Sequence, residues 1–83
     1  MNKLIIMEYM NRIKKEDINN FSLKQGINIS KKDLDIIYEY IKNDAMRILN
    51  NPIDVINEIK DKVSYDVYIK ILELYNKFKD KIS

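Results

Sequence analysis

Turn-forming residues are nearly absent from this sequence. Gly26 and Pro52 are the only glycine and the only proline among 83 residues. Sandwiches and barrels join many short strands by turns rich in these residues, so an all-β fold is disfavoured. The apolar fraction of 46% and the charged fraction of 34% are typical of a globular chain. Because this length has room for one domain, we expect a single helical domain over residues 1–83.

Apolar residues recur at helical spacing along most of the chain. The pattern predicts an all-α fold, a compact bundle of four to five short helices. The expected helices cover about 3–14, 16–25, 31–43, 52–63 and 65–82, and the third either ends near Asn43 or continues to Leu49. The last helix carries the longest apolar stripe, made of Tyr68, Ile71, Leu72, Tyr75, Phe78 and Ile82.

Residues that favour helix ends separate these segments. Gly26 suits the position just past a helix, where a left-handed backbone is needed. Ser30 is a good N-cap, and Asp33 three residues later predicts a capping box with Asp in place of Glu. Pro52 fits the first position of a helix, and Ser64 is a candidate cap for the last one.

The residue types that most enzymes use are missing. The chain has no His and no Cys, which removes the usual neutral-pH base, the thiol nucleophile and most zinc ligands. A single glycine excludes a phosphate-cradling loop. We therefore expect no enzyme, no catalytic residue, no cofactor, no metal site and no small-molecule ligand.

Carboxylates form two groups along the chain, which we interpret as solvated helix surface. No glycine turn follows Asp33 and Asp35, so a calcium loop of the EF-hand type is not supported. The groups consist of Asp33, Asp35 and Glu39, and of Asp54, Glu58 and Asp61.

The cellular location follows from two features. A small secreted domain usually needs disulfides, so the lack of cysteine favours a reducing compartment. No stretch approaches the roughly 20 apolar residues of a membrane span. We expect a cytoplasmic protein without a membrane partner.

The charge is too balanced to indicate nucleic-acid binding by itself. Fifteen basic and 13 acidic residues give a net charge of +2. Segment 16–43 is nevertheless compatible with a helix-turn-helix, which keeps a nucleic-acid-binding domain as the alternative function. Against it, Lys31 and Lys32 are followed by acidic side chains, which phosphates would repel.

The third predicted helix is apolar on two sides. Its main stripe holds Leu34, Ile37 and Ile41, whereas Ile36 and Tyr40 lie opposite. A helix of this kind must bury both faces or expose one. We predict that Ile36 and Tyr40 are interface residues that contact another chain; the alternative is that the first or the last predicted helix of the same chain folds across this face. The leading function is therefore a non-enzymatic protein–protein interaction module or a small homo-oligomer.

Six short segments spread over most of the chain form a recognisable set: Met1-Asn2, Arg12-Ile13, Gln25-Gly26-Ile27, Ser30, Asn57-Glu58-Ile59 and Leu74-Tyr75-Asn76-Lys77-Phe78. In these segments the sequence resembles the YqfT-like family of short uncharacterised proteins from low-GC Gram-positive bacteria. The resemblance implies a compact helical domain of the bacterial cytoplasm, with no assigned activity and no site residues.

Overall fold

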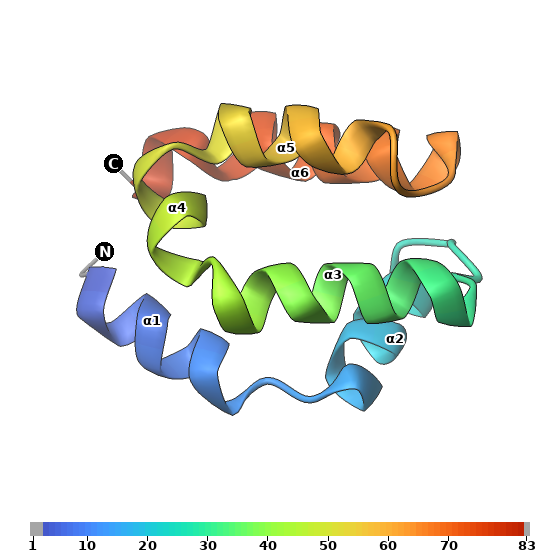
Figure 1. Ribbon diagram of the computed structural model, residues 1–83, viewed down its shortest axis with the longest axis horizontal. Coiled ribbons are helices and arrows are strands. Elements are labelled where there is room, and N and C mark those ends of the chain that lie inside the picture. Colours follow the sequence, from blue (N-terminus) through green and yellow to red (C-terminus); the bar gives the residue numbers. More distant parts are fainter. Residues whose placement is uncertain (1–2, 83) are drawn as a thin grey trace.

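Six helices and no strand make up residues 3–82, the part of the chain that the computed structural model describes (Figure 1). The prediction of an all-α fold is confirmed, with six helices rather than four to five. Met1, Asn2 and Ser83 of the predicted domain lie outside the described residues, as does the side chain of Ile82. The helices are α1 (Lys3–Arg12), α2 (Lys15–Lys24), α3 (Lys31–Asn43), α4 (Ala45–Asn50), α5 (Pro52–Lys60) and α6 (Tyr65–Ile82).

The sixth helix arises because α3 ends at Asn43. Asp44 leaves the helical backbone region with φ −121° and ψ 29°, although its N–H still donates to the Tyr40 carbonyl at 2.9 Å. The chain then restarts as the separate short helix α4, in which Ala45 is buried. Of the two predicted ends of the third helix, Asn43 is confirmed and Leu49 is wrong.

The helices form two layers joined by α4. Figure 1 shows α5 and α6 side by side on one level, and α3 on the other level with α1 and α2. The N- and C-terminal ends of the chain lie at the same end of the molecule. α3 contacts α1, α2 and α4, and α6 packs mainly on α5. None of the helices in the described range is long and apolar enough to span a membrane.

The core is thin and lies mostly between α3 and α5. Tyr40 of α3 packs against Val55 and Ile59 of α5, and this is the main cluster of buried side chains. No large side chain in the described part is completely enclosed, as expected for a chain that buries a small share of its surface. The buried apolar residues are Met10, Ile18, Ile29, Tyr40, Ala45, Val55, Ile56, Ile59 and Val67.

Gly26 ends α2 as the sequence predicts. Its φ of +80° is left-handed, a conformation that strains any residue with a Cβ. The Gly26 N–H donates to the Leu23 carbonyl at 3.0 Å, and the Ile27 N–H donates to the Ser22 carbonyl at 2.9 Å. These two bonds form a Schellman motif, which turns the chain toward α3.

Asp33 connects the beginnings of α3 and α6. The Asp33 N–H donates to Oγ of Ser30 at 3.1 Å, which confirms Ser30 as the N-cap. The predicted return bond from the Asp33 carboxylate to Ser30 is wrong, because Oδ2 of Asp33 accepts the N–H of Ser64 at 3.0 Å instead. Asp33 is only 5% exposed, so this bond is shielded from water. It joins residues 31 positions apart and satisfies a donor at the start of α6.

We predict that Asp33→Ala lowers the free energy of unfolding by about 2 kcal/mol, because it removes a charge-assisted acceptor from a shielded N–H. Asp33→Asn keeps a hydrogen-bond acceptor, so its free energy of unfolding should fall by less. Asp35→Ala is the matched control, because it breaks only the exposed pair with Lys15 and costs less than about 1 kcal/mol. Urea denaturation followed by circular dichroism measures all three, and equal values for the two alanine variants would contradict the role of Asp33.

Candidate functional site

The carboxylates of the sequence are distributed among separate structural roles. Asp33 is buried as described above, which corrects its interpretation as solvated surface. Asp35 pairs with Lys15 at 3.0 Å, and Glu58 pairs with Arg47. Among the described residues, no three acidic side chains come together to form a metal-binding group.

Ile36 and Tyr40 face α5 of their own chain. Tyr40 is 9% exposed and packs on Val55 and Ile59, and Ile36 packs against the same cluster. The prediction of an interface assumed that no helix of the same chain covers this face of α3. That premise is wrong, because α5 folds across it. The pair therefore belongs to the core, although the helix that covers it is the one that begins at Pro52 and not the first or the last helix.

The Tyr40 hydroxyl lies at the edge of that core in a polar cluster. It donates to Oε1 of Glu58 at 3.2 Å and accepts from Nζ of Lys62 at 2.7 Å. The guanidinium of Arg47 pairs with the same Glu58 carboxylate. The hydrogen bond from Arg47 lowers the pKa of Glu58, and the bond to Tyr40 raises the pKa of Lys62. All members of the cluster have partners, so it locks α3, α4 and α5 together rather than offering a reactive group.

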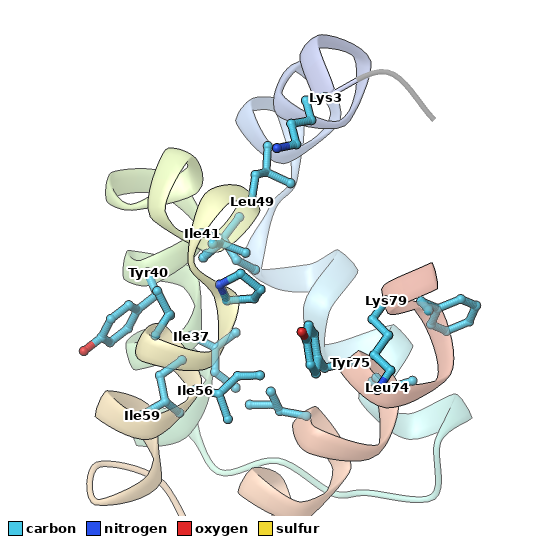
Figure 2. A pocket seen from close by; sticks show the side chains of 15 residues that line it. Lys3, Ile37, Tyr40, Ile41, Leu49, Ile56, Ile59, Leu74, Tyr75 and Lys79 are labelled. Atoms are coloured by element: carbon cyan, nitrogen blue, oxygen red, sulfur yellow. The ribbon is translucent and has the colours of Figure 1, made fainter. Parts of the chain in front are cut away.

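An apolar cavity of about 540 Å³, here called the main cavity, lies between α3, α5 and α6 (Figure 2). It exists because the other stripe of α3, with Ile37 and Ile41, faces α6 without close packing. α6 is the opposite wall, where Ile71, Leu74 and Tyr75 are only half-buried. The cavity is lined by Lys3, Ile37, Tyr40, Ile41, Ile48, Leu49, Pro52, Val55, Ile56, Ile59, Ile71, Leu74, Tyr75, Phe78 and Lys79.

A second hollow of about 350 Å³, here called the side groove, lies between α1, α2, α3 and α6. Tyr9 and Phe21 line it although their side chains are 66% and 48% exposed, so the groove has an aromatic rim. Asp17 and Lys70 supply charges of both signs. Four residues line both hollows: Ile37, Ile41, Ile71 and Leu74.

Sequence reasoning missed both hollows. The one relevant signal in the sequence was the number of apolar positions on the third and last predicted helices. That number exceeds what a single neighbouring helix can cover. The interface hypothesis assigned that excess to Ile36 and Tyr40. The structure places the unfilled space on the opposite face of α3, at Ile37 and Ile41.

The helix-turn-helix alternative requires α3 to present a free face along its length. In the structure the exposed side chains of α3 are Lys31, Lys32, Glu39 and Asn43, and the Asp35 side chain is partly exposed on the same face. Because carboxylates occupy the middle of this face, its charge does not favour insertion of α3 into a DNA groove.

Comparisons of the chain with protein-family models, with curated proteins and with solved structures found no match in any of the three. The resemblance to the YqfT-like family stays a prediction. The function must therefore be inferred from the residues of this chain alone.

The lowered pKa of Glu58 makes stability depend on pH. The folded state holds this carboxyl ionised below its ordinary pKa of 4.5, so the unfolded state binds more protons in acid. The stabilisation is complete above that value and is lost as the pH falls through the lower pKa of the folded state. We predict that Glu58→Gln reduces the dependence of the free energy of unfolding on pH below about pH 5.

The matched control is Glu8→Gln, which changes an exposed glutamate of α1 and should keep the wild-type dependence. Urea unfolding at a series of acidic pH values provides the measurement. If the free energy of unfolding changes equally with pH in Glu58→Gln and in the wild type, the cluster does not favour the ionised form of the Glu58 carboxyl.

Proposed function

We propose that this chain is a non-enzymatic protein-interaction module that self-associates through the side groove. The observation that carries the proposal is the pair of exposed aromatic side chains, Tyr9 and Phe21, at the rim of an apolar groove. Aromatic residues are enriched at the centres of protein interfaces, where they fill pockets on the partner.

The neighbouring surface is also unusually apolar for a monomer. Two helices of a thin bundle leave several large apolar side chains largely in water, which is typical of an association surface. On α1 and α2 these residues are Leu4, Ile5, Tyr9, Phe21 and Leu23.

A second copy of the chain is the partner that the charges favour. In a two-fold dimer each residue of one copy meets the same surface on the other. Asp17 and Lys70 both line the groove and carry opposite charges, so a pair between copies would form beside the bonds that they make in their own chain, from the Lys14 N–H to Asp17 at 2.9 Å and from Lys70 to Glu73 at 3.1 Å. The net charge of +2 produces little repulsion between copies.

The groove favours binding over catalysis. Ser22 lines it, but the Ser22 hydroxyl donates to the Ile18 carbonyl at 3.0 Å, and the sequence contains no imidazole to activate it. A cytoplasmic location remains part of the proposal and is supported by the lack of cysteine.

We predict that Phe21→Ser weakens self-association at least about tenfold, the effect expected of an interface anchor. Ile53→Ser is the matched control, because Ile53 of α5 is 46% exposed, nearly as much as Phe21, but does not line the groove or belong to the apolar surface of α1 and α2. It should change the dissociation constant by less than about twofold. Sedimentation velocity over a range of concentrations gives the constants.

Two results would contradict the proposal. One is a wild-type protein that stays monomeric at every concentration. The other is an equal loss of association in the two serine variants, which would mean that general surface hydrophobicity, rather than the groove, drives association.

A further inference from the structure

We propose that the main cavity binds a single-chain amphiphile with an anionic head group, either a fatty acid or an alkyl phosphate. The hydrocarbon tail lies between α3, α5 and α6, and the head group lies at the rim, which Lys3 and Lys79 make basic. This site adjoins the side groove, with which it shares four lining residues, but it does not depend on self-association.

The size and lining of the cavity suit an alkyl chain. Its volume of about 540 Å³ falls within the roughly 300–1,000 Å³ typical of small-molecule sites. Side chains from three helices give it aliphatic walls, with Ile37 on α3, Ile56 on α5, and Ile71 and Leu74 on α6. Each methylene group that leaves water for such walls gains about 0.8 kcal/mol, so a flexible chain is held without directional contacts.

The charges at the cavity select an anion. Lys3 and Lys79 are its only charged lining residues in the described part of the chain, and both are basic. Figure 2 shows them on different helices around the cavity. Nζ of Lys3 donates to Oδ1 of Asn50 at 3.2 Å, which positions this ammonium at the edge. The side groove differs, because Asp17 accompanies Lys70 there.

Tyr75 adds a polar group at the cavity wall. Figure 2 shows its ring projecting from α6 into the cavity, with the hydroxyl turned away from the helix. A phenolic O–H donates to a carboxylate or phosphate oxygen, and a bond to an ionised acceptor is stronger than a neutral one. The lining residues of the cavity therefore offer hydrogen-bond donors and positive charge but no carboxylate, which suits a head group that only accepts hydrogen bonds. A cationic amphiphile would meet two like charges.

Titration of the intact chain, followed by NMR of the isoleucine methyl groups, tests the proposal. The probes share one alkyl chain and are used below micelle-forming concentrations: decanoate, decyl phosphate, decanol and decyltrimethylammonium. We expect at least one anionic probe to shift the methyl signals of Ile48, Ile56 and Ile59, which line only the main cavity, and to bind about tenfold more tightly than decanol. The relative affinity of decanoate and decyl phosphate distinguishes a carboxylate ligand from a phosphate ligand.

Two variants test the head-group site. The double variant Lys3→Gln, Lys79→Gln should stay folded. Its affinity for the anionic probe should fall to that for decanol. Lys24→Gln is the matched control, since Lys24 is an exposed lysine at the end of α2 that lines neither hollow. The control should bind as the wild type does.

The proposal is overturned if no anionic probe shifts the cavity methyl signals, or if decanol or the cationic amphiphile binds as tightly as the anions. It is also overturned if the double lysine variant keeps the wild-type affinity. Each of these results leaves the self-association proposal untouched, because that proposal concerns Phe21 and the dissociation constant of the dimer.

Discussion

The packing of Tyr40 on α5 is the contact on which the rest of the structure depends. Its ring meets Val55 and Ile59 in the best-buried part of the molecule, and its hydroxyl bonds to both Glu58 and Lys62. Tyr40 thus combines a buried ring with a hydrogen-bonded hydroxyl, as is typical of a buried tyrosine. This contact turns one face of α3 toward α5. The opposite apolar face of α3 is left to α6.

The position of α6 follows from that contact and from Asp33. The Asp33 carboxylate holds the start of α6 beside the start of α3, and α5 supports the helix along one side. Farther along α6, Ile71 and Leu74 approach Ile37 across the two hollows and are only half-buried. A short chain with few helices cannot both cover the Tyr40 face and close this space. The hollows, and any binding in them, are consequences of that shortage.

Local signals in the sequence predicted helix ends well. Gly26, Ser30 and Pro52 act through bonds or backbone angles within a few residues, so their positions can be read from neighbouring residues. Non-local partners could not be predicted in this way. The Asp33 carboxylate bonds to a residue 31 positions away, and nothing in the periodicity of α3 indicates that α5 covers Ile36. The hollows were missed for the same reason, because hydrophobic periodicity marks an apolar face without showing how closely another helix packs on it.

α3 and α6 enclose unfilled apolar space, and the free energy of unfolding of Leu74→Phe tests this, since Leu74 lines both hollows. Ala45→Leu serves as the control at a buried site that lines neither hollow, where added volume should cost about 1–3 kcal/mol. We expect Leu74→Phe to be as stable as the wild type or more so, because the larger ring enters existing space. A loss for Leu74→Phe as large as that of the control would show that α3 and α6 are already closely packed.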